Sequence, residues 1–249
     1  KFKPRYATVY FLYNEDGSPK AVILPVSGYG LWSTLYGFIA VEADGKYRAD
    51  WRWLPGQGHT DFPAIIAALR SDQFVGDWLF TSAAFGCRSD EAAYREACSD
   101  VLDTCARLEM DFDDLCRLRD ETVPALVDQW AAGTDWSRYC VVGFTSMFEQ
   151  NVAALALARR IRERAPGVCI VFGGANFDGE MGPEYVRAFP WIDYAVTGEG
   201  DLVLPRLVEQ VSRGASAIGM AGVTGRRDGT VVSAGPAPKV SRMDDLPDP

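Results

Sequence analysis

Three short segments combine glycine with small, uncharged polar side chains, and each begins where a buried strand is predicted to end. They are GFTSMFEQN (143–151), GGANFDGEMG (173–182) and GEGD (198–201). Glycine lets the backbone turn sharply and lets a bulky ligand approach the main chain, while hydroxyl and amide groups supply neutral hydrogen bonds. Because none of the three segments contains Lys or Arg, the pattern favours a large ligand that is amide-rich or carries a nucleotide over a bare anion.

Other kinds of chemistry find little support in the same segments. Asp178, Glu180 and Glu199 are carboxylates in glycine loops, where such groups more often cap helices or bind backbone amides than act as acids or bases. The chain has neither G-x-G-x-x-G at a strand–helix junction nor a G-K-[ST] phosphate loop, and it has no cluster of His and Cys. We therefore predict no catalytic residue and no protein metal ligand.

The region from 139 to 214 alternates strand-like and helix-like patterns. Apolar runs such as YCVVGF and VCIVFGG are separated by NVAALALARRIRERAPG, for which Asn151 is the expected cap. This order predicts parallel strands joined by crossover helices, an α/β doubly wound sheet similar to the Rossmann fold. Ligands of such sheets bind beyond the carboxyl ends of the strands, where the three glycine segments lie. The segment AGVTGRRDGTVV that follows predicts a hairpin with an Asp-Gly turn.

The rest of the chain divides by pattern into further zones. The predicted domains are a β-rich segment (1–50), a helical cap or insertion (51–136), the α/β domain (137–240) and a linker (241–249). In the helical zone we expect a cap at Ser89 or Asp90, a helix end at Gly86 and one apolar stripe, formed by Ala93, Cys98, Leu102, Cys105 and Leu108. Because the chain begins at Lys1 and ends at DDLPDP, we expect it to be part of a longer protein.

Composition excludes several classes of protein. The 249 residues are 48% hydrophobic, carry a net charge of −9 and have a pI near 4.7, which predicts a globular protein without a nucleic-acid partner. The uncharged run Ala21–Val41 has the length of a membrane span, but Pro25 and three glycines interrupt it. We therefore predict strand–turn–strand structure there, no membrane association and a cytoplasmic location.

The glycine segments together carry a resemblance. The set GFTSMFEQN, FGGAN-x-x-GEMGP and GEGD resembles the cobalamin-binding domain of cobalamin-dependent radical SAM enzymes, in particular the maturases and C-methyltransferases that act on ribosomally made peptides. The similarity runs from about Trp51 to the chain end. It implies that the corrin ring lies on a rim that we define by ten residues: Thr145, Ser146, Met147, Gly173, Gly174, Ala175, Asn176, Gly198, Glu199 and Gly200.

Two motifs of that family are missing. The D-x-H-x-x-G motif that ligates cobalt in many cobalamin proteins is absent, and the only histidine is His59. The C-x-x-x-C-x-x-C motif of the iron–sulfur cluster is also absent. The resemblance thus implies a domain that holds the methyl-carrying corrinoid. S-adenosylmethionine, the 4Fe-4S cluster and the peptide substrate belong to a radical SAM domain that would follow in the chain, so we expect this piece alone to be inactive.

A second resemblance concerns the amino-terminal segment. Residues 6 to 46, with VILPVSGYGLWSTLYGFIAVEADG, are similar to the flavin-binding region of one subunit of the Na+-translocating NADH:quinone reductase. That family of subunits carries FMN on a threonine in an S-[GT]-A-T motif, which is absent here. Two alternatives therefore stand beside a cobalamin domain: an FMN-binding electron-transfer module and a ligand-binding module without redox chemistry.

Overall fold

A computed structural model of the chain describes residues 10–13, 19–29, 34–41, 74–86, 90–107, 110–147 and 150–240. The amino-terminal strands form an antiparallel sheet in the order β1 (Tyr10–Tyr13), β2 (Pro19–Tyr29) and β3 (Thr34–Val41). The run from 21 to 41 falls on β2 and β3, so the two predicted strands are confirmed, while residues 30–33 between them lie outside the described residues. Among the described residues, no helix has the length and apolar character needed to cross a bilayer.

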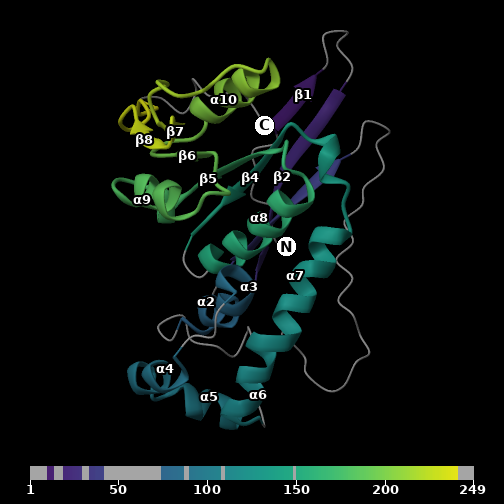
Figure 1. Cartoon of the computed structure of the whole chain (residues 1–249), viewed down its shortest axis with the longest axis vertical. Helices are drawn as coiled ribbons and strands as arrows, with labels where there is room; N and C mark the ends of the chain where they lie inside the picture. The colour runs from purple at the N-terminus through teal and green to yellow at the C-terminus, as the bar shows by residue number, and fades with distance from the viewer. Residues whose placement is uncertain are drawn as a thin grey trace, which may run out of the picture.

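The second sheet has five strands, which follow one another in space in the order of the sequence (Figure 1). Its strands are β4 (Val141–Thr145), β5 (Cys169–Gly173), β6 (Tyr194–Val196), β7 (Val223–Arg227) and β8 (Thr230–Ser233). The first three are parallel, while β7 and β8 are antiparallel to their neighbours. The predicted α/β class is confirmed, and the predicted hairpin is the part that makes the sheet mixed.

The hairpin turn has the backbone conformation that its sequence predicts. Asp228 and Gly229 both have positive φ, 51° and 77°. Two consecutive positive φ values are typical of a two-residue hairpin loop whose twist matches that of the strands, and Asp-Gly is one of the preferred pairs for it. The turn joins β7 to β8 in the register Arg227 to Thr230.

Helices cover both faces of the five-stranded sheet. They are α8 (Asn151–Arg164), α9 (Met181–Ala188) and α10 (Val203–Ser212). Alternate residues of β5 point to opposite faces: Ile170 and Phe172 belong to the core with α8 and α9, whereas Val171 packs with α10. Both faces are apolar because both are covered by helices. In Figure 1 the strands lie between α10 on one side and α8 and α9 on the other.

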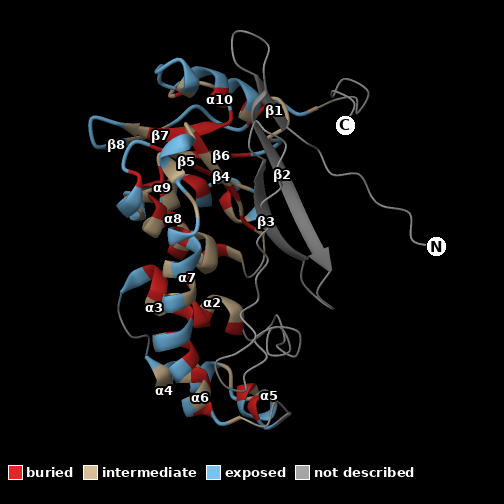
Figure 2. Cartoon of the chain, turned by 90° about the vertical axis from the view of Figure 1, so that its right-hand side faces the viewer, coloured by how far each residue is buried: buried red, intermediate tan, exposed pale blue. Residues whose placement is uncertain are grey.

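The helical zone packs on the outer side of α8 (Figures 1 and 2). Its helices are α2 (Val75–Leu79), α3 (Thr81–Phe85), α4 (Glu91–Ala97), α5 (Val101–Arg107), α6 (Phe112–Arg117) and α7 (Val123–Ala132). In Figure 2 buried residues continue from the sheet through α8 into α2, α3 and α7. The zone and the sheet therefore share one hydrophobic core.

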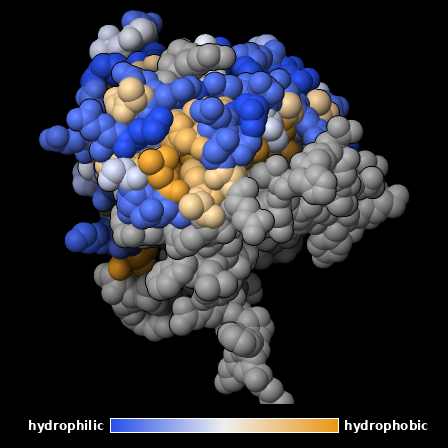
Figure 3. Space-filling view, turned by 90° about the horizontal axis from the view of Figure 1, so that it is seen from below, coloured by the Kyte–Doolittle hydropathy of each residue, from blue (hydrophilic) through white to orange (hydrophobic). Residues whose placement is uncertain are grey.

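Helix ends in this zone follow the predicted signals, but the apolar stripe does not. Gly86 ends α3 with a φ of 68°, and the Asp90 carboxylate accepts a hydrogen bond from Ala93 N–H at 3.0 Å. The predicted single stripe is wrong because the helix breaks after Ala97, which changes the phase between α4 and α5. Consequently Ala93 is exposed and Leu102 is 43% exposed, while Leu108 lies outside the described residues. Figure 3 views the molecule from the end formed by α4, α5 and α6, and shows apolar residues at the surface beside hydrophilic ones.

A π-helical turn, η2 (Leu118–Thr122), connects α6 to α7. The Val123 N–H donates to the Leu118 carbonyl, five residues back. Pro124 explains the wide turn, because it has no N–H to donate to residue 120 and its ring crowds that carbonyl. The turn includes the fully buried side chain of Arg119.

Candidate functional site

The three glycine segments meet at one edge of the five-stranded sheet. β4 ends at Thr145, β5 at Gly173 and β6 at Val196, and because these strands are parallel neighbours their carboxyl ends coincide. The predicted start of the first segment is wrong, since Gly143 lies inside β4, paired with Val171. A β-carbon on Gly143 would meet no atom within 4 Å, so packing does not require a glycine there.

Ser146 joins the first loop to the second. Its N–H donates to the Gly173 carbonyl at 2.8 Å, and its own carbonyl accepts from Asn176 N–H at 3.1 Å. Its hydroxyl also accepts a hydrogen bond from Asn176 Nδ2 at 3.0 Å. These three hydrogen bonds fix one loop against the other, which makes this part of the rim a preformed surface.

Gly174 makes this close approach possible. A β-carbon at this position would lie 2.6 Å from the Ser146 carbonyl oxygen and 2.9 Å from its nitrogen, and the φ of 96° disfavours any side chain. At Gly173 the nearest atom to an added β-carbon would be the Val196 carbonyl oxygen at 3.6 Å, an ordinary contact. Gly174, unlike Gly173, is therefore required because the backbone of Ser146 in the first loop leaves no room for a side chain.

A buried polar cluster lies beneath these two loops. The Ser146 hydroxyl donates to Asn151 Oδ1 at 3.2 Å, and Asn151 Nδ2 donates to the Tyr185 hydroxyl. Asn151 was predicted to cap α8, and this is wrong: the N-cap position is Gln150, whose side chain makes no cap hydrogen bond. The Gln150 Oε1 instead accepts from Met147 N–H at 3.1 Å, within the first loop.

The cap of α8 comes from the helical zone. Asp77, in α2, accepts a hydrogen bond from Val152 N–H at 3.0 Å. Burial raises the pKa of the Asp77 carboxyl above its ordinary value, and the hydrogen bond from Val152 partly opposes that rise. A carboxylate from a distant helix therefore takes the position that Asn151 was expected to fill.

The third loop is held by the second loop and by the chain that follows β8. Gly198 N–H donates to Asp178 Oδ1 at 3.0 Å, and Ala237 N–H donates to the Thr197 carbonyl at 3.1 Å. Glu199 Oε2 accepts from Val240 N–H. The Glu199 carboxylate, predicted as part of the rim, thus binds the segment that leaves the domain.

The ten predicted rim residues differ in exposure. Four are exposed at the surface: Gly174, Ala175, Gly198 and Glu199. Five are half-buried: Thr145, Met147, Gly173, Asn176 and Gly200. Ser146 is fully buried. A ligand on this edge therefore meets main chain of the second and third loops first, while Ser146 acts from below.

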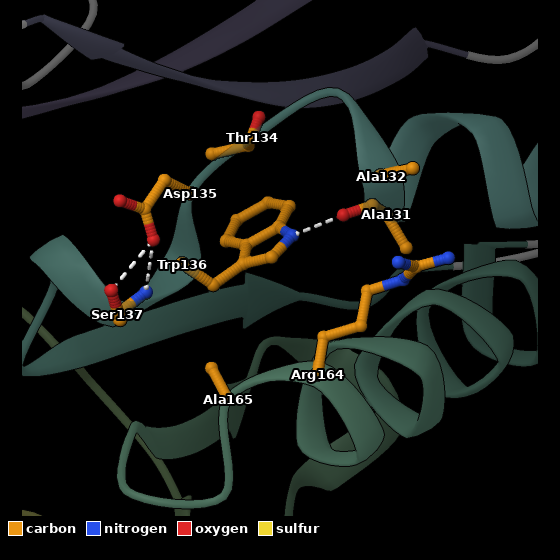
Figure 4. A pocket seen from close by; sticks show the side chains of 8 residues that line it. All are labelled: Ala131, Ala132, Thr134, Asp135, Trp136, Ser137, Arg164 and Ala165. Carbon is orange, nitrogen blue, oxygen red and sulfur yellow. Dashed lines mark hydrogen bonds between the residues drawn. The ribbon is translucent and has the colours of Figure 1, made fainter.

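A cavity of about 220 Å³ lies at the opposite edge of the sheet (Figure 4). Thr134, Asp135 and Trp136 line it from the connection that leads into β4, and Arg164 lines it from the end of α8. Figure 4 shows the Trp136 indole N–H donating to the Ala131 carbonyl, a distance of 2.7 Å. Since β4 runs from this edge to the rim, the cavity is separate from the predicted site.

Metal ligands do not gather in the described part of the chain. No group of three or more His, Cys, Asp or Glu side chains within it is placed to hold a metal ion. His59 lies outside the described residues.

Similarity to known proteins is confined to parts of their length. No protein-family model matches the chain. Over 44 residues it is 59% identical to a subunit of the Na+-translocating NADH-quinone reductase from Pseudomonas aeruginosa, 18% of this chain and 16% of that protein. The corresponding Neisseria meningitidis protein is 47% identical over 46 residues. These matches confirm the predicted amino-terminal resemblance as a short similarity.

A longer match is to a methyltransferase. The chain is 30% identical over 110 residues to an uncharacterized methyltransferase of Pyrococcus horikoshii, a match that covers 44% of this chain and 24% of that protein. Among solved structures, the radical S-adenosylmethionine methyltransferase TsrM of Kitasatospora setae, with cobalamin and a 4Fe-4S cluster bound, gives a TM-score of 0.37 at 24% identity, over 59% of this chain and 27% of that chain. The chain thus spans about a quarter or less of each relative.

Proposed function

We propose that residues 137–240 form a cobalamin-binding domain whose corrinoid rests on the rim at the carboxyl ends of β4, β5 and β6. In this proposal the domain belongs to a methyltransferase or peptide maturase of the radical SAM type. The iron–sulfur cluster, S-adenosylmethionine and the peptide substrate are assigned to another part of that protein. In the same proposal residues 51–136 are an insertion and 241–249 a linker, and of these 51–73 and 241–249 lie outside the described residues.

The observation that carries the proposal is the junction of three loops at one edge of three parallel strands. Ligands of open α/β sheets bind at this position. Gly174, Ala175 and Gly198 expose main chain there, so a flat ring can approach the backbone without meeting long side chains. The 30% identity to a methyltransferase over 110 residues supports the same class of protein.

The donor and acceptor groups at the rim fit cobalamin. Its corrin ring carries amide side chains, which form hydrogen bonds with neutral groups and with peptide N–H and C=O groups. Thr145 and Asn176 are half-buried neutral residues at the end of β4 and in the loop after β5. When bound, cobalamin would carry the methyl group that is transferred. The rim residues of this chain would hold the ring and orient it through hydrogen bonds with its amide side chains.

Reconstitution of the whole chain tests this proposal. The protein is incubated with hydroxocobalamin, separated from free cofactor by gel filtration and measured by absorption spectroscopy. We expect the cobalamin spectrum to elute with the protein at close to one equivalent. Elution of the protein without that spectrum, from a sample that is folded by circular dichroism, would contradict the proposal.

A second candidate function is binding of FMN by the amino-terminal segment. The 59% identity over 44 residues to a subunit of a sodium-translocating reductase favours it. The same gel filtration with FMN in place of hydroxocobalamin separates the two candidates, because a retained flavin gives a yellow protein. Retention of neither cofactor would favour a ligand-binding module without redox chemistry.

A further inference from the structure

One hydrogen-bond chain runs from α9 to the surface of the rim. Tyr185 in α9 accepts from Asn151, at the start of α8; Asn151 accepts from the Ser146 hydroxyl, and Ser146 accepts from Asn176 Nδ2. Ser146 is fully buried and Asn151 is 9% exposed. Asn176 and Tyr185 are half-buried, and Asn176 and Ser146 belong to the rim, so Asn151 and Tyr185 can act on the rim only through them.

The chain has a direction. Asn176 donates to Ser146, Ser146 donates to Asn151, and Asn151 donates to Tyr185, which accepts. A hydroxyl can rotate to suit either neighbour, but an amide has separate donor and acceptor ends. Because Asn151 donates to Tyr185 with its nitrogen, its oxygen faces Ser146, and the Ser146 proton points away from Asn176. In this arrangement the nitrogen end of the Asn176 amide turns inward, toward Ser146.

The Tyr185 ring is itself held in place. Its centroid lies 4.5 Å from the Phe177 ring, which belongs to the second rim loop, and 5.8 Å from the Phe189 ring. Phe177 is fully buried. The hydroxyl of Tyr185 therefore sits on a rigid base, and its loss leaves the packing of the ring unchanged.

We propose that Tyr185 and Asn151 are positioning residues of the rim, which fix Ser146 and Asn176 for a corrinoid. This inference rests on the proposed function, and neither residue is among the ten rim residues predicted from the sequence. Buried polar chains of this kind are sensitive to the removal of one member, because the remaining donors lose their partners.

Four variants of the whole chain test the inference. Tyr185→Phe removes only the hydroxyl, and Tyr194→Phe is its matched control. The Tyr194 hydroxyl accepts from Ala217 N–H at 3.3 Å, but at the start of β6, away from the rim. Asn151→Leu removes both hydrogen bonds of Asn151. Asn151→Asp keeps both, because one carboxylate oxygen accepts from Ser146 and the other from the Tyr185 hydroxyl, and the N-terminus of α8 favours the negative charge.

Two measurements are made on each variant. We expect Tyr185→Phe and Asn151→Leu to raise the Kd for hydroxocobalamin by about three- to tenfold, the effect of about one hydrogen bond. Asn151→Asp and Tyr194→Phe should stay within about twofold of the original protein. In the absence of cofactor, hydrogen exchange of the Asn176 backbone N–H, which donates to the Ser146 carbonyl, should be faster in Tyr185→Phe and Asn151→Leu only.

The two measurements separate failure of this inference from failure of the proposed function. If the original protein retains no cobalamin, the proposed function fails. Exchange of the Asn176 backbone N–H then still reports whether the series of hydrogen bonds positions the second loop. If Tyr185→Phe matches Tyr194→Phe in both measurements, Tyr185 is a packing residue and the inference is overturned.

Discussion

The Asp77 carboxylate accepts a hydrogen bond from the Val152 N–H at 3.0 Å, across 75 positions of the sequence. This contact anchors α2 to the first turn of α8, next to the polar cluster under the rim. Because Asp77 satisfies one of the free N–H groups of the helix start, it joins the helical zone to the part of the sheet where the site lies.

Asp77→Asn keeps an oxygen for Val152 and removes the buried charge. The pKa of Asp77 is raised in the folded protein. Its contribution to stability is therefore fully present below the unfolded pKa of about 3.8 and is lost as pH rises through the folded value. At pH 7 we expect Asp77→Asn to be at least as stable as the original protein in urea denaturation. The advantage of the variant should shrink as the pH is lowered towards 4.

Asp77→Ala is the matched comparison, because it removes the oxygen as well as the charge. We expect it to lower the free energy of unfolding by about 1 kcal/mol relative to Asp77→Asn at pH 7, the usual value of a helix cap. Equal stabilities of the two variants would contradict the role of Asp77 as the cap of α8.

Arg119 is a second buried group that ties the helical zone together. It is fully buried, binds Asp120 at 2.7 Å and Glu91 at 2.6 Å, and its guanidinium lies 4.4 Å from the centroid of the Trp78 ring. Since both carboxylates retain some exposure, we expect Arg119→Ala to cost about 3 kcal/mol of unfolding free energy, the lower end for a broken buried pair.

Arg117→Ala is the control for this substitution. Arg117 pairs with Asp114, and its side chain is 63% exposed. We expect its loss to leave the unfolding free energy close to that of the original protein in the same denaturation experiment, because solvent screens an exposed ion pair. Similar costs for the two variants would show that the buried cluster does not hold the helices together.

Gly174→Ala tests the contact between the first two rim loops. The added β-carbon would lie 2.6 Å from the Ser146 carbonyl oxygen at a φ of 96°, so either the loops separate or the backbone changes conformation. We expect a lower melting temperature and at least a tenfold rise in the Kd for hydroxocobalamin. Gly167→Ala should change neither, because its β-carbon meets no atom within 4 Å and it lies at the other edge of the sheet.

Glu199→Ala tests the contact that holds the segment after β8. Without the carboxylate, the Val240 amide loses its acceptor, and we expect its hydrogen exchange to accelerate by about fivefold or more. The unfolding free energy should change by less than about 0.5 kcal/mol, because Glu199 is exposed. Glu199→Gln retains an oxygen and should leave the exchange rate close to that of the original protein. Unchanged exchange in Glu199→Ala would contradict this role.

The sequence predicts the order of the elements and the edge at which the loops meet. Apolar runs mark β4 and β5, Asp-Gly marks the β7–β8 turn, and Gly86 marks the end of a helix. These signals are local, because each depends on a few consecutive residues whose backbone preferences agree with the fold.

The sequence does not predict which partners the rim residues choose. The contacts of Asp77 with Val152 and of Asn151 with Tyr185 cannot be predicted from sequence spacing, because neither pair lies on one helix face or one strand. Gly174 shows the same limit: its pattern indicates close approach, but only the packed loops identify the Ser146 backbone as the neighbour.

The arrangement of the five-stranded sheet bears on how this protein is made. Because the strands lie side by side in the order β4-β5-β6-β7-β8, each strand pairs with the one synthesised just before it. Pairing between near neighbours in sequence closes shorter loops and is kinetically faster than pairing between distant segments. No strand of this sheet has to be inserted between two strands that precede it in the sequence, so the topology allows the strands to add one after another at the edge that ends in β8.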